Sequence, residues 1–159
     1  MDKESIWERK CSPLLVEPCD MRVRQVGSGD TTLLPALAYA AFADTVDEAP
    51  LERWTRKISA ILTNGYGTLL TDASFVAEMP SGQLAGAVLV SDFALYGAPV
   101  IAMIAVSPPA QRKGLGSVLL RRSVCALALK GVLSCCAKIS PENEASQRLF
   151  ARTGFGLRS

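Results

Sequence analysis

The stretch that decides the fold is residues 104–122, IAVSPPAQRKGLGSVLLRR. It is preceded by apolar residues, and the run Val100–Val106, rich in β-branched side chains, predicts a buried strand. Pro108 and Pro109 end this strand, because proline has no N–H to donate to a sheet. Leucine and valine then recur at helical spacing. The stretch is therefore predicted to form a strand, a turn and a helix.

The turn, QRKGLG at residues 111–116, has the features of an anion-binding loop. The first turn of a helix has free backbone N–H groups and the positive end of the helix dipole, which together suit a phosphate. Gly114 and Gly116 allow the backbone to approach a ligand closely, and Arg112 and Lys113 add positive charge. An ordinary strand-to-helix connection with solvated basic residues fits this segment equally well. The Walker and dinucleotide glycine patterns are both absent.

Two segments together carry a resemblance to a known family. Residues 111–116, preceded by VSP, are similar to the Q/R-x-x-G-x-G/A acyl-CoA motif of the GNAT acetyltransferases. Residues 143–155, NEASQRLFARTGF, resemble the N-x-x-A-x-x-L-Y-x-x-x-G-F segment of the same family, in the same order along the chain. The resemblance extends over about residues 21–155. It implies an α/β (α+β) acyl-CoA N-acyltransferase fold, in which helices flank a mixed, mostly antiparallel twisted sheet.

The resemblance also implies an enzyme, an acyltransferase that moves an acetyl group from acetyl-CoA to a primary amine of a small-molecule or peptide acceptor. The amine would attack directly in a ternary complex, and the backbone N–H of Val106 would polarise the thioester carbonyl as an oxyanion donor. The implied cofactor-binding residues come from the strand, the turn and the last helix: Ile104, Ala105, Val106, Gln111, Arg112, Lys113, Gly114, Leu115, Gly116, Ser117, Asn143, Ser146 and Phe150.

The chain departs from the family pattern at its acid/base positions. Phe150 stands where relatives often have a tyrosine that protonates the leaving thiolate, and Ala102 and Met103 stand where relatives frequently have a carboxylate. Direct attack by a neutral amine needs only positioning and carbonyl polarisation, so activity is still expected. Asp92 and Tyr96 are the remaining weak catalytic candidates, although such residues more often have solvated structural roles.

Two other functions stay open, and the departures from the family pattern favour the first of them. A catalytically weak member would bind acyl-CoA as a sensor or an interaction module, without efficient turnover. An unrelated phosphate-binding domain would bind ATP or another nucleotide with no preference for CoA. Acetyl transfer is the hypothesis that the two motifs favour.

Composition excludes several other classes of protein. A chain of 159 residues that is 49% hydrophobic can form one domain with its own core. Its net charge of +2 argues against nucleic-acid binding, and no apolar run approaches the roughly 18 residues of a membrane span. With no histidine, we expect no metal site, and five cysteines without paired spacing are expected to be reduced thiols. The charged N-terminus lacks a signal-peptide pattern, which predicts a cytoplasmic protein.

The organisation predicted is an N-terminal extension, residues 1–20, followed by a single acetyltransferase domain, residues 21–159. Ile6 and Trp7 suggest a short helix in the extension. Further strands are expected at residues 21–26, 74–79, 84–90 and 132–139, and helices at 32–42 and 50–62, with Ser140 capping the last helix.

The acidic connection between the first two helices, residues 44–48, either attracts a cationic amine or is simply solvated. At the other end of the chain, the C-terminal strands look short or missing. The sheet edge must then be shielded by the N-terminal extension or by a partner chain in a homodimer.

Overall fold

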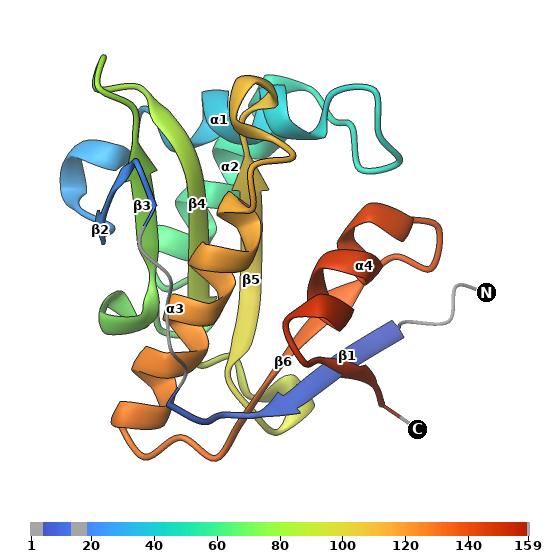
Figure 1. Cartoon of the computed structure of the whole chain (residues 1–159). Coiled ribbons are helices and arrows are strands. Elements are labelled where there is room, and N and C mark those ends of the chain that lie inside the picture. Colours follow the sequence, from blue (N-terminus) through green and yellow to red (C-terminus); the bar gives the residue numbers. More distant parts are fainter. Residues whose placement is uncertain (1–4, 14–18, 159) are drawn as a thin grey trace.

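The computed structural model describes residues 5–13 and 19–158, and these form one sheet flanked by helices (Figure 1). The strands are β1 (Ser5–Lys10), β2 (Arg22–Gln25), β3 (Phe75–Glu78), β4 (Leu84–Ser91), β5 (Val100–Val106), β6 (Ser134–Ile139) and β7 (Gly156–Leu157). The helices are α1 (Leu34–Phe42), α2 (Leu51–Leu62), α3 (Leu115–Leu129) and α4 (Glu144–Arg152), with 3-10 turns at η1 (Ser28–Asp30), η2 (Thr71–Ala73), η3 (Ala94–Tyr96) and η4 (Pro108–Ala110).

The sheet has the order β2-β3-β4-β5-β6-β1-β7. Strands β2 to β5 form an antiparallel meander, and β5 then connects through α3 to the parallel strand β6. This arrangement confirms the predicted α/β fold with a mostly antiparallel sheet, and the strand, turn and helix expected from residues 104–122 are all present. The last strand, β7, is short, as expected.

The N-terminal segment is part of the sheet, so the short helix predicted around Ile6 and Trp7 is wrong. Strand β1 pairs antiparallel with β6 from Ser5↔Ile139 to Lys10↔Ser134, and β7 pairs with the other edge of β1. The unpaired N–H and C=O groups along the edge of β6 explain this outcome, because they offer an extended segment a full set of hydrogen bonds. The N-terminal extension is thus the element that covers β6, and the homodimer remains a prediction. Residues 1–4 and 14–18 of that extension lie outside the described residues.

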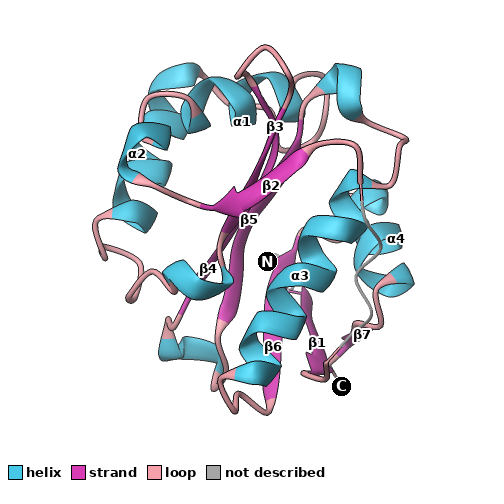
Figure 2. Cartoon of the chain, turned by 60° about the vertical axis from the view of Figure 1, so that its left-hand side comes forward, coloured by secondary structure: helices cyan, strands magenta, loops and turns pink. Residues whose placement is uncertain are grey.

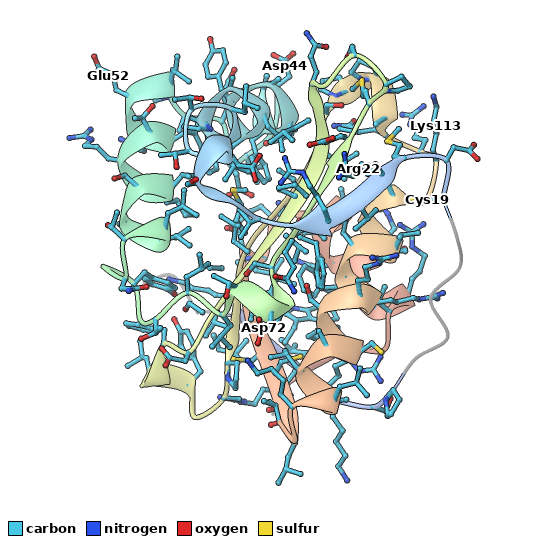
Figure 3. The ribbon with its side chains drawn as sticks, turned by 90° about the vertical axis from the view of Figure 1, so that its left-hand side faces the viewer. Cys19, Arg22, Asp44, Glu52, Asp72 and Lys113 are labelled. Carbon is cyan, nitrogen blue, oxygen red and sulfur yellow. The ribbon has the colours of Figure 1, made fainter. Side chains whose placement is uncertain are left out.

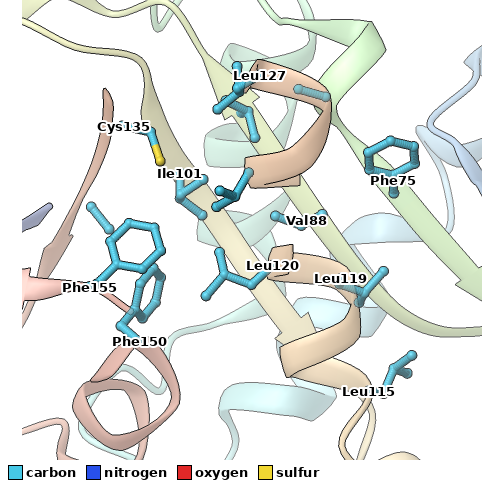
Figure 4. Close-up of a cluster of buried hydrophobic side chains, with 14 of the residues drawn as sticks. Phe75, Val88, Ile101, Leu115, Leu119, Leu120, Leu127, Cys135, Phe150 and Phe155 are labelled. Atoms are coloured by element: carbon cyan, nitrogen blue, oxygen red, sulfur yellow. The ribbon is translucent and has the colours of Figure 1, made fainter. Parts of the chain in front are cut away.

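Two hydrophobic cores lie on opposite faces of the sheet, with α3 and α4 on one face and α1 and α2 on the other (Figure 2). Strand β4 is buried along its whole length because helices cover both of its faces. In the first core, side chains of α3 such as Leu119, Leu120 and Leu127 pack on Val88 of β4 (Figure 4). Gly86 allows this close packing, because a Cβ there would lie 2.9 Å from Leu119 Cδ1.

A partly buried ion-pair network holds the edge strand β2. Arg24 donates from Nε to Glu78 Oε1 at 2.6 Å and from its two terminal nitrogens to Asp30 at 2.7 and 2.8 Å. Asp30 is 1% exposed, and its bonds with Arg24 hold the pKa of its carboxyl below the ordinary value despite burial. The network joins β2, β3 and η1 beside the start of α1.

Helix α4 begins later than predicted. Ser140 was expected to cap it, but the helix starts at Glu144 and its N-cap is Asn143, whose Oδ1 accepts the Ser146 N–H at 3.0 Å. A Ser-Pro pair and an Asn three residues later are both cap signals, and the asparagine provides the hydrogen bond in the structure.

Within the part of the chain that the structure describes, no helix combines the length and hydrophobicity needed to span a bilayer.

Candidate active site

Strands β5 and β6 diverge, and this divergence opens the centre of the sheet (Figure 1). Their only ladder pair among the described residues is Val100↔Cys136, with the Cys136 N–H donating to the Pro99 carbonyl at 2.9 Å. Beyond that pair, no described residue forms a ladder with the β5 backbone on its β6 side. In an ordinary sheet these peptide groups would be satisfied by the neighbouring strand, so they are available to a ligand.

The direction of the β5 peptide groups can be followed from its last hydrogen bond with β4. The Ser107 N–H donates to the Ala85 carbonyl at 2.8 Å, so the Ser107 amide faces β4. Because peptide groups alternate in direction along a strand, the N–H groups of Val106 and Ile104 face the gap. The Val106 carbonyl on that side accepts Gln111 Nε2 at 3.0 Å. The gap therefore has backbone donors on its β5 side, at residues that the sequence singled out.

The turn before α3 contains two residues in the left-handed backbone conformation that occurs in many anion-binding loops. Arg112 has φ +66° and Gly114, the N-cap of the helix, has φ +78°, and both values lie in the left-handed region. Left-handed residues within a turn make successive N–H groups point into one concavity, here at the positive end of a 15-residue helix. Gln111, Arg112, Lys113 and Gly114 are all exposed, whereas the Leu115 side chain is buried in the first core. Leu115 therefore offers only its backbone to a ligand.

Gly116 has a packing role in addition to the ligand role that the sequence suggested. A Cβ at this position would lie 3.3 Å from Leu149 Cδ2 of α4 and 3.7 Å from Val106 Cγ2. The absence of a side chain thus brings the first turn of α3 close to both α4 and the end of β5. These are the three elements that carry the predicted cofactor-binding residues.

A cavity of about 450 Å³ lies at the gap between β5 and β6. Its walls come from β5, β6, α2, α4 and the connection between α1 and α2. Four of the predicted cofactor-binding residues line it: Ile104, Asn143, Ser146 and Phe150. The other predicted residues, Ala105, Val106 and the segment 111–117, lie outside its lining, and the Ala105 side chain is buried in the second core.

Asp47 joins two walls of this cavity. Its Oδ2 accepts Asn143 Nδ2 at 2.6 Å and its Oδ1 accepts the Ser140 hydroxyl at 3.4 Å. The contact ties the α1–α2 connection to the beginning of α4, across 96 residues of sequence. The sequence placed Asp47 only in an acidic loop and gave no signal for this contact. Asn143 is both the helix cap and the partner of Asp47, so its amide is held in one orientation.

Two lysines lie where the main cavity meets a smaller one of about 250 Å³, and sequence reasoning missed both. Lys57 of α2 and Lys138 of β6 line both cavities. Lys57 also lies over the Trp54 ring, with Nζ 5.3 Å from the ring centroid. Although Lys57 is an exposed residue, the protein atoms around its ammonium group lower its pKa. Asp47 acts to raise this pKa, and the charge of Lys138 lowers it further.

The contacts of Phe150 and of the weak catalytic candidates, Asp92 and Tyr96, are structural. Phe150 is 3% exposed and packs edge to face on Phe155, with ring centroids 5.0 Å apart (Figure 4). Asp92 accepts the Thr68 N–H through Oδ1 at 2.5 Å, and the Tyr96 carbonyl accepts Arg158 Nη2 at 3.1 Å. Neither Asp92 nor Tyr96 lines either cavity, and the structure does not bring them together with Asn143 or the turn.

Neither the cysteines nor the carboxylates of the described residues form a group of three or more potential metal ligands. All five cysteines are free thiols, and Cys135 and Cys136 are buried. A hydrogen bond with Cys11, together with burial, raises the pKa of the Cys135 thiol, which suits a packing role in the first core.

The fold is shared with solved acetyltransferase structures. A GCN5-related N-acetyltransferase from Sphaerobacter thermophilus superposes with a TM-score of 0.74 and 20% identity, over 99% of this chain and 50% of that one. A GNAT family acetyltransferase from Brucella melitensis, solved in complex with acetyl-CoA, gives 0.65 and 22% identity over 87% of both chains. The ribosomal-protein-S18-alanine N-acetyltransferase from Escherichia coli gives 0.65 and 19% identity over 87% of this chain and 79% of that one.

This chain spans half the length of the Sphaerobacter protein. No curated protein matches it in sequence. A family model described as the Acetyltransferase (GNAT) family matches residues 39–155, which include the strand, the turn and helices α3 and α4. Since this match extends over well more than half of the sequence, the chain belongs to the Acetyltransferase (GNAT) family.

Proposed function

We propose that the protein is an N-acetyltransferase that moves an acetyl group from acetyl-CoA to a primary amine, by direct attack in a ternary complex. The observation that carries this proposal is the divergence of β5 from β6 beside the left-handed turn at the start of α3. Backbone amides of β5 that face the gap thus lie next to the N-terminus of α3. The β5 amides suit a thioester, and the helix N-terminus suits phosphates. Family membership and the acetyl-CoA complex of the Brucella relative support the same donor.

In this proposal the cofactor runs along three elements. The pyrophosphate binds the N–H groups of residues 111–116, with Arg112 and Lys113 supplying charge and Ser117 following in the first helical turn. The pantetheine arm lies along Ile104, Ala105 and Val106 and completes the missing side of the β5 ladder. Residues Asn143, Ser146 and Phe150 contact it from α4, on the far side of the gap. The open space beside Gly114, where a Cβ would meet nothing within 4 Å, leaves room for the phosphates.

The chemistry requires positioning and carbonyl polarisation. The neutral amine enters the cavity of about 450 Å³ and its lone pair forms the new C–N bond at the thioester carbon. The Val106 N–H stabilises the charge that develops on the carbonyl oxygen. The C–S bond then breaks and its electron pair leaves with the CoA thiolate, while the amine releases its proton to water. Because Phe150 has no hydroxyl, water also protonates the thiolate.

A second function, acyl-CoA binding without efficient turnover, is favoured by one observation. Phe150 is buried and packs on Phe155, so a phenyl ring without an acidic hydrogen stands at the position that could carry an acid. Both functions require acetyl-CoA to bind, and only the enzyme transfers the acetyl group to an amine. Multiple-turnover release of CoA in the presence of an amine distinguishes them.

The first experiment measures thermal stabilisation by acetyl-CoA, with CoA and ATP as controls. At about one hundred times its dissociation constant, acetyl-CoA should stabilise the protein by roughly 2.7 kcal/mol, which shifts Tm by several degrees. Gly114→Asp should abolish the shift by placing a carboxylate against the phosphates.

The matched control is Gly114→Asn, because Asn has the same shape, no charge and a better tolerance of the positive φ at this position. A retained shift in Gly114→Asn with a lost shift in Gly114→Asp supports the turn as the phosphate site. No shift with any CoA compound in the unmodified protein would refute the proposed function.

A further inference from the structure

Two cysteines, one after β1 and one in β6, project from the same face of the sheet. The Cys11 N–H donates to the Leu133 carbonyl at 2.8 Å, which extends the antiparallel ladder of β1 and β6 past the end of β1. Cys135 lies directly opposite Arg9 in this ladder. Side chains alternate between faces along a strand, and opposite residues share a face. Arg9, Cys11 and Cys135 are therefore neighbours on the face that carries the first core.

The thiols of Cys11 and Cys135 contact each other on that face. Cys135 belongs to the first core, and Cys11 is half-buried and packs against the same cluster. The two residues are diagonal neighbours in the ladder, a relation in which Cα atoms lie about 7–8 Å apart and side chains lie closer. A hydrogen bond joins the two thiols. A disulfide needs a slightly shorter Cα separation, and Cys11 stands just after the last residue of β1, where the backbone can supply that small shift.

The two thiols differ in their access to solvent. Cys135 is 0% exposed, whereas Cys11 keeps part of its surface exposed. The Arg9 guanidinium is held on the same face, because it donates to the Thr153 carbonyl at 2.6 Å and to the Ser12 hydroxyl at 3.1 Å. The hydrogen bond with Cys135 and the charge of Arg9 lower the pKa of the Cys11 thiol, and burial opposes them. An oxidant in solution therefore reacts first at Cys11, where a fixed cation favours the thiolate.

We propose that Cys11 and Cys135 are a redox-active pair, which a low-molecular-weight disulfide oxidises to an intramolecular disulfide that fastens the end of β1 to β6. In the reduced protein both are free thiols, and Cys135 packs in the core. Disulfides that form in cytosolic proteins are usually transient, so the pair responds to oxidation and is restored by reduction. Neither acetyl-CoA binding nor acetyl transfer is needed for this reaction.

The oxidation takes two thiol–disulfide exchange steps. With glutathione disulfide, the Cys11 thiol releases its proton to water and the thiolate attacks one sulfur, so that a mixed disulfide forms and one glutathione thiolate leaves. Cys135 then releases its proton and attacks the Cys11 sulfur of the mixed disulfide. The bond between Cys11 and glutathione breaks, and the second glutathione thiolate leaves. The two thiolates take up the two protons, and the cysteine pair has transferred two electrons to glutathione disulfide.

The disulfide acts on the strand that covers the edge of β6. Strand β1 pairs with β6 along its whole length, and on its other side it pairs with the two residues of β7. A covalent bond at the end of β1 holds the strand on β6 when the hydrogen bonds between them open. The bond also closes a long loop, from residue 11 to residue 135, and so restricts the unfolded chain. The oxidised protein should therefore melt several degrees higher than the reduced protein.

The test begins with the unmodified protein and glutathione disulfide. After oxidation, two of the five free thiols should be lost. Digestion with trypsin without reduction should give peptides 11–22 and 131–138 joined to each other. Each of these peptides also contains a second cysteine, Cys19 in the first and Cys136 in the second. Fragmentation of the joined peptides by mass spectrometry should assign the bond to Cys11 and Cys135.

Four variants identify the reacting sulfurs independently. Cys11→Ser should abolish the joined peptides. Cys135→Ala should stop the reaction at the mixed disulfide, so that Cys11 gains the mass of one glutathione. Cys19→Ser and Cys136→Ala are the matched controls, because each removes the other cysteine of the same peptide, and both should still form the bond. If the buried Cys135→Ala fails to fold, the assignment in the unmodified protein decides.

The control cysteines lie away from the contact between the proposed pair. The Cys136 Sγ lies on the opposite face of the sheet, 3.7 Å from the Ala98 carbonyl oxygen. The Cys19 Sγ donates to the Met21 carbonyl at 3.3 Å, just before β2, which three strands separate from β6. Figure 3 shows Cys19 toward the end of the molecule that carries Lys113. A bond through either control sulfur would thus require a different arrangement of the sheet.

Each outcome decides the proposal. A bond between Cys11 and Cys135, with a rise in Tm that dithiothreitol reverses, supports it. Retention of all five thiols, a bond through Cys19 or Cys136, or a disulfide between two chains on a non-reducing gel overturns it. A mixed disulfide that persists at Cys11 in the unmodified protein overturns the role of Cys135. A joined protein that melts with the reduced protein overturns the fastening of β1.

Discussion

At the residue scale, Asp47 holds the connection between α1 and α2 against the start of α4. Its bond with Asn143 Nδ2, at 2.6 Å, is charge-assisted, and Asn143 in turn caps α4 through the Ser146 N–H. Two segments that line one cavity are thus joined through two side chains. The orientation of the Asn143 amide, which the proposed cofactor site uses, depends on a loop that also lines the cavity.

We expect Asp47→Ala to destabilise the protein by about 1.5–3 kcal/mol, since a hydrogen bond to a charged group is lost and the α1–α2 connection is released. For a chain of this length, the drop in Tm should be several degrees in a thermal melt. Glu48→Ala is the matched control, because it removes the same charge from the same loop and Glu48 is an exposed side chain. In a double-mutant cycle, Asp47→Ala and Asn143→Ala should be non-additive, and additive effects would contradict the direct coupling.

Short-range signals explain which site residues could be predicted from the sequence. The turn 111–116 and Asn143 were identified because each belongs to a compact motif, and the structure places Asn143 in the cavity wall. The contact of Asp47 with Asn143 could not be predicted, because it joins residues 96 positions apart that only the folded chain brings together. Lys57 and Lys138 were missed for the same reason: each is an ordinary surface lysine on its own element.

At the element scale, strand β1 shows how an open sheet edge selects its partner. The strands β2 to β6 could be predicted from their hydrophobic pattern and turn signals, because β3 to β6 have buried residues and β2 alternates apolar and polar side chains. Nothing local in residues 5–10, SIWERK, favours a strand over a short helix, and only the edge of β6 decides the outcome. Its register with β6 is continuous over six residues, whereas β7 adds only two pairs on the other side.

We expect Glu8→Pro to disrupt this arrangement. Glu8 pairs with Cys136 on β6 and Gly156 on β7, and proline cannot donate in a strand that is paired on both sides. The loss should be about 1–3 kcal/mol, and the exposed edge of β6 should cause concentration-dependent association in light scattering. Glu8→Gln is the control, because it removes only the surface ion pair with Arg158 at 2.9 Å, worth about 0–1 kcal/mol. A Glu8→Pro variant with unchanged Tm and mass would show that β1 contributes little.

At the scale of the whole molecule, the sheet consists of two halves. One half is the meander β2 to β5, and the other is β6 with β1 and β7. Among the residues that the structure describes, the pair Val100↔Cys136 alone joins the two halves in the sheet. The first core bridges them, because α3 packs on the meander and meets Phe150 and Phe155 beside β6 (Figure 4). A ligand in the gap would contact β5 and α3 on one side and α4 on the other, and would therefore brace the two halves.

This architecture leads to a prediction for amide hydrogen exchange. Without ligand, amides of β6 and α4 should exchange faster than those of β3 and β4, because the second half is held to the first by fewer backbone bonds. Saturating acetyl-CoA should slow exchange in β6 and α4 by up to about a hundredfold, since opening of the gap then requires release of the ligand. Exchange in β3 should change little.

The Gly114→Asp variant should show no such protection at the same concentration. Protection confined to the turn 111–116, with β6 and α4 unaffected, would mean that the cofactor binds to the meander half alone and that the gap between the strands is not bridged.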